Sequence, residues 1–219
     1  MIAERARQVL DRIAAACARA HRDPSEVHLI AVAKGHPAVA VREAYAAGLH
    51  DIGENYAQEL VAKQAACSEL PVRWHFIGRL QRNKAKLVAG QVELVHAVET
   101  VELAAELGKR AGGQVQPILI SVNLAGETTK GGVTADALPE LAKQIADVPG
   151  VRLDGLMTMP PPVDDPEQNR PYFEQLRKLG GELRLPLLSM GMSDDFEVAI
   201  ACGATHVRVG TAIFGPRAP

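Results

Sequence analysis

The stretch Leu29-Ile30-Ala31-Val32-Ala33 is apolar at five consecutive positions. A strand with one face in water would alternate apolar and polar residues, so this run predicts a strand that is buried on both faces, as in a parallel sheet covered by helices. The segment 38–47 that follows has a helical pattern. We therefore expect a strand over residues 27–33 and a helix after it, which together make one βα unit.

The same alternation recurs along the rest of the chain. The further units are 51–52 with 56–66, 72–77 with 81–88, 92–97 with 101–110, 116–123 with 135–147, 152–157 with 171–183, 187–188 with 196–202, and 205–209 with 212–214. Repeated βα units make a parallel sheet, and about eight of them in 219 residues favour closure into a barrel. We predict an α/β fold, a (β/α)8 TIM-like barrel over residues 27–215 with an extra N-terminal helix over 1–21, in one domain spanning 1–219.

Glycines and prolines mark the connections between these units. Four glycines lie between a helical pattern and the next strand, where the end of a helix favours a residue that tolerates left-handed backbone angles; they are Gly48, Gly108, Gly150 and Gly203. The proline-rich segment 160–166 lies between a strand and its helix. We expect it to be a long loop on the functional face rather than a linker between domains.

Composition narrows the class of protein. The formal net charge of −2 gives no overall attraction for nucleic acid or for an anionic membrane, and the residues 1–20 lack the apolar run of a signal peptide. Three cysteines without close pairing or metal-ligand spacing indicate a reducing compartment and buried apolar roles; they are Cys17, Cys67 and Cys202. We expect a cytoplasmic protein that does not act on nucleic acid or membranes.

The carboxyl ends of barrel strands meet at one mouth, so the residues after each strand are the candidates for chemistry. Lys34 follows the most hydrophobic strand. An amine desolvated at the rim of such a strand favours the neutral nucleophile that condenses with an aldehyde. The alternative is a lysine that only extends its amine to solvent at a strand end.

Two clusters near the C-terminus are candidate phosphate sites. Small residues there let backbone N–H groups approach an anion, the hydroxyls of Ser193 and Thr211 can donate hydrogen bonds to it, and a helix N-terminus adds a favourable dipole. The clusters are Ser189 to Asp195 after the seventh strand and Arg208-Val209-Gly210-Thr211 after the eighth. The carboxylates of Asp194 and Asp195 would repel a phosphate dianion, so both side chains must point away from the phosphate site. The alternative readings are a helix cap at 193–195 and a plain turn at Gly210.

Three other strand ends carry candidates with structural alternatives. Asn55 follows the second strand and either contacts a ring substituent or caps a helix, and His75 is more readily a hydrogen-bonded core residue than a catalyst. Met157 and Met159 either pack against a flat ring or fill the core. The scattered histidines give no metal site, and the basic residues at 82, 84 and 86 predict a solvated helix face.

Five motifs in the same order resemble the pyridoxal phosphate homeostasis proteins, a family whose members look like the barrel domain of alanine racemase standing alone. The motifs are Ala31 to Lys34, Gly53 to Glu59, Trp74 to Gly78, Met190 to Asp195 and Arg208 to Gly215. The chain differs from the family pattern in that Ala33 and Gly35 flank the lysine, where a hydroxyl residue is usual, and in Arg82, which replaces a small polar residue.

The resemblance implies that Lys34 forms a Schiff base, the internal aldimine, with pyridoxal 5'-phosphate (PLP). By the same comparison Ser193, Gly210 and Thr211 hold the phosphate, Arg208 faces the pyridine nitrogen, and Asn55 and Met192 lie near the ring. A guanidinium in that position only donates hydrogen bonds, which leaves PLP a weak electron sink. Racemases also take a catalytic tyrosine from a second domain and a partner subunit, and this chain has no residues left for such a domain.

Three hypotheses follow. The first is a monomeric PLP carrier or buffer without robust catalysis, whose partners are PLP and PLP-dependent apoenzymes. The second is a PLP-dependent racemase or decarboxylase of small amino acids. The third is a phosphate-binding barrel enzyme that uses Lys34 as a Schiff base with a sugar aldehyde and needs no PLP.

Overall fold

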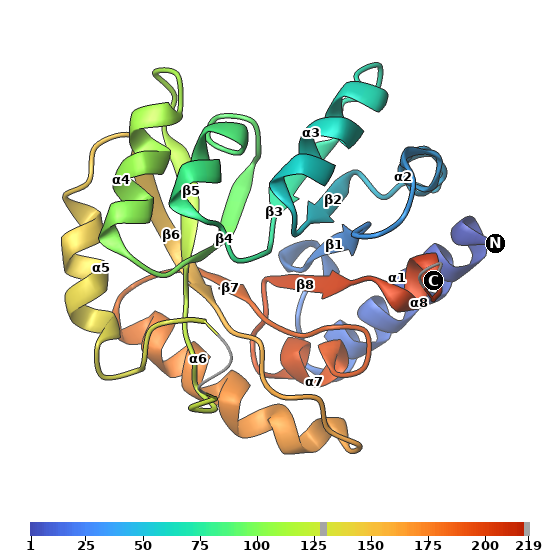
Figure 1. Cartoon of the computed structure of the whole chain (residues 1–219). Helices are drawn as coiled ribbons and strands as arrows, with labels where there is room; N and C mark the ends of the chain where they lie inside the picture. The colour runs from blue at the N-terminus through green and yellow to red at the C-terminus, as the bar shows by residue number, and fades with distance from the viewer. Residues whose placement is uncertain (128–130, 217–219) are drawn as a thin grey trace.

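The computed structural model describes residues 1–127 and 131–216. Eight parallel strands form a closed barrel in chain order, with β8 hydrogen-bonded to β1 (Figure 1). The strands are β1 (His28–Val32), β2 (Asp51–Glu54), β3 (Arg73–Phe76), β4 (Leu94–Val98), β5 (Gln116–Ser121), β6 (Val151–Met157), β7 (Leu187–Ser189) and β8 (His206–Val209). The predicted (β/α)8 barrel with an additional N-terminal helix is confirmed.

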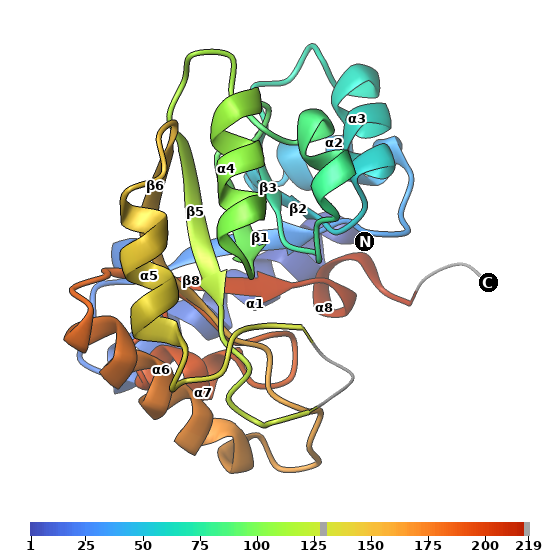
Figure 2. The same cartoon turned by 60° about the vertical axis from the view of Figure 1, so that its left-hand side comes forward.

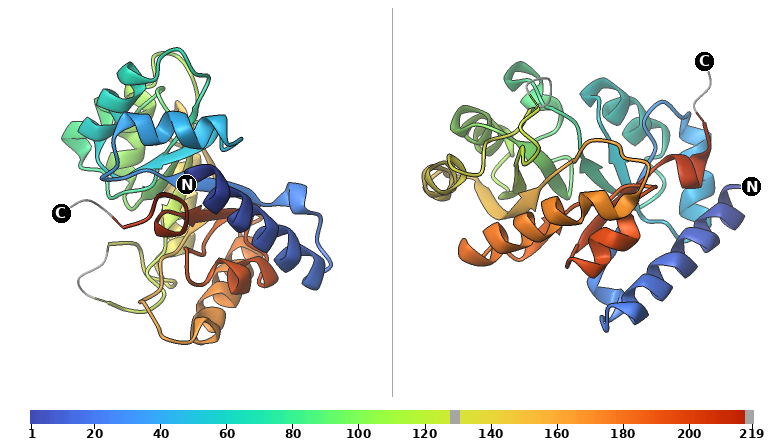
Figure 3. Two further views of the ribbon diagram at one scale, coloured as in Figure 1. Left: turned by 90° about the vertical axis from the view of Figure 1, so that its right-hand side faces the viewer. Right: turned by 90° about the horizontal axis from the view of Figure 1, so that it is seen from below.

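Helices surround the strands on the outside of the barrel (Figure 3). They are α1 (Ile2–Arg19), α2 (Ala38–Ala46), α3 (Ala57–Ala66), α4 (Val101–Arg110), α5 (Leu138–Ala146), α6 (Arg170–Glu182), α7 (Phe196–Ala201) and α8 (Thr211–Phe214), with the 3-10 segments η1 (Pro24–Glu26), η2 (Arg82–Leu87) and η3 (Pro166–Asn169). The pair α4 and α5 packs against β6 (Figure 2). Within the described ranges, no helix combines the length and the apolar character needed to cross a bilayer.

The N-terminal helix α1 packs across the outside of the barrel against α2, α7 and α8. Its buried side chains recur every three or four residues, which places them on one face of the helix; they are Ile2, Ala6, Val9, Ile13, Ala16 and Cys17. The opposite face carries charged side chains such as Glu4 and Arg7. Because α1 packs against α8, the two ends of the described chain lie side by side.

Two predicted helices differ in the structure. The pattern over 81–88 forms the 3-10 segment η2 instead of an α-helix, and the buried side chains of this stretch are Ala85 and, at the C-cap, Val88. The helix predicted from residue 135 begins at Leu138. Pro139 lacks the N–H that a helix interior needs, so it is tolerated in the first turn of α5 but not further in.

The prediction for Gly108 is wrong, although Gly48, Gly150 and Gly203 do adopt positive φ values. Gly108 lies inside α4, and a Cβ atom there would come within 2.1 Å of the carbonyl oxygen of Pro149. Close contact between α4 and the loop before β6 therefore requires glycine at this position. The sequence shows the glycine but not which of these two requirements it meets.

The strands separate apolar side chains facing the helices from a partly polar barrel interior. On β3, Trp74 and Phe76 join the main core between strands and helices, and His75 between them points to the other face. A smaller apolar cluster contains Leu94, Ala97, Leu119 and Met157. The interior thus holds buried histidine side chains beside this cluster, and the prediction that His75 is a hydrogen-bonded core residue is confirmed.

The three cysteines are buried and free, as expected for small apolar side chains. Desolvation by burial raises the pKa of each thiol, which keeps it protonated near neutral pH. The thiols therefore contribute to packing and have little nucleophilic character.

Candidate functional site

Lys34 lies in the turn between β1 and α2, directly beyond the carboxyl end of β1. Its side chain is partly buried, in contrast to the exposed Gly35 that follows. Gly35 has a φ of 72°, and the N–H of His36 donates to the carbonyl of Ala33 at 3.0 Å. The chain therefore turns sharply around Lys34, and glycine after the lysine meets the backbone requirement of that turn.

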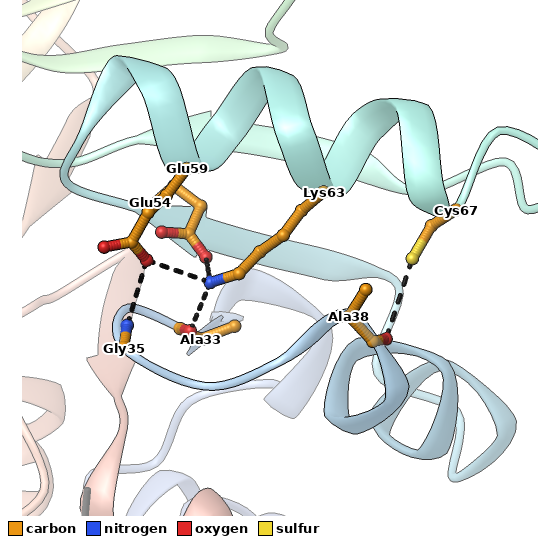
Figure 4. Close-up of polar contacts among 7 residues, drawn as sticks. All are labelled: Ala33, Gly35, Ala38, Glu54, Glu59, Lys63 and Cys67. Carbon is orange, nitrogen blue, oxygen red and sulfur yellow. Dashed lines mark hydrogen bonds and ion pairs between the residues drawn. The ribbon is translucent and has the colours of Figure 1, made fainter. Parts of the chain in front are cut away.

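Side chains of α3 and β2 hold the backbone on both sides of Lys34 (Figure 4). Lys63 Nζ donates to the carbonyl of Ala33 at 2.8 Å, and the N–H of Gly35 donates to Glu59 Oε2 at 3.1 Å. Lys63 Nζ also contacts Glu54 Oε1 at 2.5 Å and Glu59 Oε2 at 3.2 Å. This ionic clamp of Glu54, Glu59 and Lys63 fixes the loop that carries Lys34.

Burial has the largest effect on the pKa of Glu54, the most deeply buried residue of the ionic clamp. Desolvation raises the pKa of Glu54, and the hydrogen bond and charge of Lys63 oppose that rise. Glu54 is fully buried, so its carboxylate depends on Lys63 as the nearest cation. The motif from Gly53 to Glu59 was singled out in the sequence, but the role of Lys63 was missed. The available signal was a lysine three residues after Leu60 on the buried face of α3.

A cavity of about 630 Å3 opens at the carboxyl ends of the strands. Its lining includes all seven of the residues singled out from the sequence, which are Lys34, Asn55, Met192, Ser193, Arg208, Gly210 and Thr211. They come from the ends of β1, β2, β7 and β8. Residues up to 177 positions apart in the chain are thus brought together at one mouth by closure of the barrel.

Asn55 contributes a polar atom without a partner. Its side-chain oxygen Oδ1 is buried and makes no hydrogen bond to any residue that the structure describes. The helix-cap alternative is wrong, because the N-cap of α3 is Tyr56 and no side chain caps that helix. A buried polar atom without a partner costs free energy, so a hydrogen-bonding group of a bound molecule would be stabilised beside Asn55.

The end of the cavity formed by β7 and β8 offers hydroxyl groups and a glycine, from Ser193, Thr211 and Gly210. Asp195 is turned away from it, since its carboxylate accepts hydrogen bonds from the backbone N–H of Met192 at 2.6 Å and from Asn169 Nδ2 at 2.8 Å. Asp194 is exposed and belongs to the lining. The expectation that both aspartates point away is therefore met by Asp195 alone. Asp195 is the N-cap residue of α7, two residues after Ser193, and its side chain makes no capping hydrogen bond to that helix.

Arg208 extends from β8 into the wall of the cavity and is buried. Its Nη1 donates to Ser189 Oγ at 2.6 Å and its Nη2 to the carbonyl of Thr158 at 3.0 Å. Burial lowers the pKa of Arg208 to about 10, with the charge of Asp195 opposing, so the guanidinium is protonated at neutral pH. Arg208 therefore presents fixed positive charge and donors only.

Other residues of the lining extend the site beyond the sequence predictions. Met157 and Met159 both line the cavity; Met157 also belongs to the smaller apolar cluster, whereas Met159 is exposed. Glu99 and Arg79 form an ion pair at 3.2 Å between neighbouring strand ends. Asn123, at the end of the predicted fifth strand, was missed although its position after a strand was a usable signal. His75 is absent from the lining.

Comparison with known proteins agrees with this geometry. A family model described as alanine racemase, N-terminal domain, matches residues 8–218. The pyridoxal phosphate homeostasis protein of Aquifex aeolicus is 48% identical over 98% of this chain and 97% of its own, and that of Pseudomonas aeruginosa is 46% identical over 99% and 96%.

Solved structures of PipY are similar to this chain in both sequence and fold. PipY of Synechococcus elongatus PCC7942, whose structure has been solved with PLP bound, has a TM-score of 0.84 to this chain at 39% identity, covering 98% of this chain and 100% of that one. The same protein without PLP has a TM-score of 0.85. The family model matches nearly the whole of this chain, and the relatives align with it over almost their full lengths. This chain therefore belongs to the family of pyridoxal phosphate homeostasis proteins, which share the alanine racemase N-terminal fold.

Proposed function

We propose that this chain binds PLP as a Schiff base on Lys34 and acts in intracellular PLP homeostasis as a carrier or buffer. The observation that carries the proposal is one cavity lined by a lysine, a buried arginine and a group of hydroxyl side chains. Its volume of about 630 Å3 suits a small cofactor. The PLP-bound structure of PipY, 39% identical, supports the same ligand.

The residues present fit the functional groups of PLP. PLP supplies an aldehyde that condenses with amines and a pyridine ring that can accept electrons. Lys34 provides the amine, and Ser193, Gly210 and Thr211 donate to the phosphate. Arg208 donates to the pyridine nitrogen from the cavity wall. The unpartnered Oδ1 of Asn55 provides a further polar contact for the ring.

A carrier without robust catalysis is favoured by what surrounds Lys34. Arg208 is a donor held by burial and by two hydrogen bonds, and it does not protonate the pyridine nitrogen. Among the described residues no tyrosine lines the cavity: Tyr56 is exposed, and Tyr45 lies against His50. The acidic side chains of the lining are Glu99, which is paired with Arg79, and the exposed Asp194.

Absorption spectra of the purified chain test the cofactor. With PLP we expect a band near the violet edge of the visible range, which Lys34→Ala abolishes and Lys178→Ala, a change at an exposed lysine of α6, preserves. A wild-type chain without this band would refute PLP binding. A band that persists in Lys34→Ala would refute the attachment site.

Turnover measurements separate a carrier from an enzyme. The PLP-loaded chain is incubated with a panel of L-amino acids, followed by chiral analysis and assay of decarboxylation. We expect rates far below those of ordinary enzymes, and turnover at about 1 s⁻¹ or faster would overturn the carrier assignment. Transfer is measured by mixing the loaded chain with a PLP-dependent apoenzyme and following recovery of the activity of that enzyme.

The proposal also includes the setting in which the chain acts. We expect it in the cytoplasm and as a monomer, exchanging PLP with apoenzymes. Sedimentation of the loaded chain over a range of concentrations tests the monomer, and a mass that doubles at micromolar concentration would contradict it.

A further inference from the structure

The barrel interior below the cavity contains buried imidazoles that PLP binding does not use. His75, His96 and His206 are each less than 10% exposed, and none lines the cavity. Buried histidines usually have hydrogen-bond partners. His75 and His96 contact each other and polar side chains of neighbouring strands, and His206 Nδ1 lies 2.9 Å from Thr205 Oγ1. No group of three or more histidine, cysteine or acidic side chains among the described residues is arranged to hold a metal ion.

A continuous series of hydrogen bonds crosses the barrel through two of these imidazoles. Arg208 Nη1 lies 2.6 Å from Ser189 Oγ, which lies 2.8 Å from His96 Nδ1. His96 Nε2 lies 3.1 Å from His75 Nδ1, and His75 Nε2 lies 3.1 Å from Asp51 Oδ1. These five residues, the interior chain, connect the cavity wall at β8 to the first residue of β2 at the opposite end of the barrel.

Each end of the interior chain has a fixed role. Arg208 can only donate. Burial acts to raise the pKa of Asp51, but hydrogen bonds and charges of His75 and Arg73 outweigh it and hold that pKa well below its ordinary value. Asp51 is therefore ionised and can only accept, and Arg73 Nε and Nη2 anchor it at 2.8 and 2.6 Å.

The two fixed ends of the interior chain determine which ring nitrogens of His75 and His96 carry a proton. Burial, together with the charges of His75, His206 and Arg208, lowers the pKa of His96 well below its ordinary value, so His96 is neutral, with one donor and one acceptor nitrogen. Because the carboxylate of Asp51 can only accept, Nε2 of His75 carries the proton of the hydrogen bond between them. At the other end Arg208 Nη1 donates to Ser189 Oγ, so the hydroxyl of Ser189 donates to His96 Nδ1. The single proton of the neutral His96 then lies on Nε2, which donates to Nδ1 of His75.

We propose that Asp51, His75, His96 and Ser189 are positioning residues, which form a one-way hydrogen-bonded chain that orients the guanidinium of Arg208 against the ring of the bound cofactor. The inference rests on the proposed function in that Arg208 faces the pyridine nitrogen of PLP. Both ends of the guanidinium are fixed, by Ser189 at Nη1 and by the carbonyl of Thr158 at Nη2. The interior chain supplies the first of these two constraints.

The neighbouring charged and titratable groups leave this direction unchanged. The ring of His206 lies 5.9 Å from that of His96 and 6.4 Å from that of His75, and it stacks on His28 at 5.0 Å. Burial lowers the pKa of His206 to about 3, with the charges of His28 and His75 adding to the effect, so His206 is neutral near pH 7.

Nitrogen NMR of the histidine rings tests the interior chain in the absence of cofactor. In the wild-type chain we expect protons on Nε2 of both His75 and His96. Asp51→Ala removes the acceptor that fixes the proton on Nε2 of His75, so we expect the tautomer of His96 to change although Asp51 does not touch it. His28→Gln, which alters an exposed neighbour of His206, is the matched control and should change neither ring.

A second variant reports at the cofactor and removes only one hydroxyl. Ser189→Ala cuts the interior chain next to Arg208, and we expect the affinity for PLP to fall by about threefold to tenfold, with a shift of its absorption band. The His28→Gln control should retain both. Unchanged ring tautomers in Asp51→Ala, or an unchanged band and affinity in Ser189→Ala, would overturn the inference. Failure of the wild-type chain to take up PLP would instead refute the proposed function, while the ring NMR would still decide the interior chain.

Discussion

Replacing Lys63 with methionine isolates the energetics of the ionic clamp behind Lys34. The side chains of Lys63 and Glu54 are 8% and 0% exposed, and their charged groups lie 2.5 Å apart. Methionine keeps the length of the side chain but removes the cation. Glu54 Oε2 already has no hydrogen-bond partner among the described residues, so Lys63→Met leaves a buried carboxylate with little compensation.

The expected cost follows from this burial. Removing one member of a buried ion pair destabilises a fold by about 3 to 5 kcal/mol. Loss of the Lys63 cation also removes what opposes desolvation at Glu54, so the pKa of Glu54, which burial already raises, should rise further in the variant. A carboxyl with a raised pKa in the folded state favours folding when protonated. The penalty of Lys63→Met should therefore be small in acid and grow as the pH rises through the pKa of Glu54 in the variant.

Urea unfolding of wild type and variant, at about pH 5 and about pH 8, measures this difference in the free energy of unfolding. Lys178→Met is the matched control, because Lys178 and Glu182 form an exposed pair at 3.8 Å, and its effect should stay within about 0.5 kcal/mol at both pH values. Adding Glu54→Gln to Lys63→Met should recover part of the loss. A penalty for Lys63→Met below about 1 kcal/mol at pH 8, or one independent of pH, would show that Lys63 does not stabilise the buried carboxylate of Glu54.

Three further predictions concern packing and protonation. Gly108→Ala should destabilise the chain by about 1 to 3 kcal/mol because of the contact with Pro149, whereas Gly181→Ala in α6, where a Cβ meets nothing within 4 Å, should stabilise it by about 0.5 to 1 kcal/mol; thermal unfolding that ranks the two variants the other way would disprove this account of Gly108. Burial lowers the pKa of His206 to about 3, so folding excludes a proton that the unfolded chain binds below about pH 6.5. Stability should fall as the pH drops from there towards 4, less steeply in His206→Gln, and equal slopes in urea unfolding would count against a buried neutral imidazole. The buried thiols should react with a disulfide reagent only after urea is added, and fast labelling of the folded chain would contradict their packing; they are Cys17, Cys67 and Cys202.

The fold was predictable because each strand and helix of the barrel has a recognisable local sequence pattern. Continuous apolar runs marked strands buried on both faces, and helical patterns between them left few alternatives to a parallel barrel. Local patterns failed where long-range contacts decide. The 3-10 form of η2 and the contact at Gly108 both depend on which part of the barrel packs against these residues. The neighbouring residues in the sequence do not show which part that is.

The cavity lining was predictable for a related reason, since the residues after parallel strands converge whatever their order in the chain. The interior chain was not. His75 was recognised as a core residue, but its contact with His96 depends on the register of β3 against β4, which pairs His75 with Leu94. Register, and the depth at which Asp51 and Ser189 lie in the barrel, follow only from its closure.

Covalent trapping identifies the lysine to which PLP is attached. The full chain is incubated with PLP, reduced with sodium borohydride, digested, and analysed by mass spectrometry to locate the phosphopyridoxyl group. We expect the group on Lys34 and, at equimolar PLP, an unmodified Lys178, which is exposed. Modification spread over exposed lysines, or a Lys34 peptide recovered unmodified from the loaded chain, would contradict attachment at Lys34.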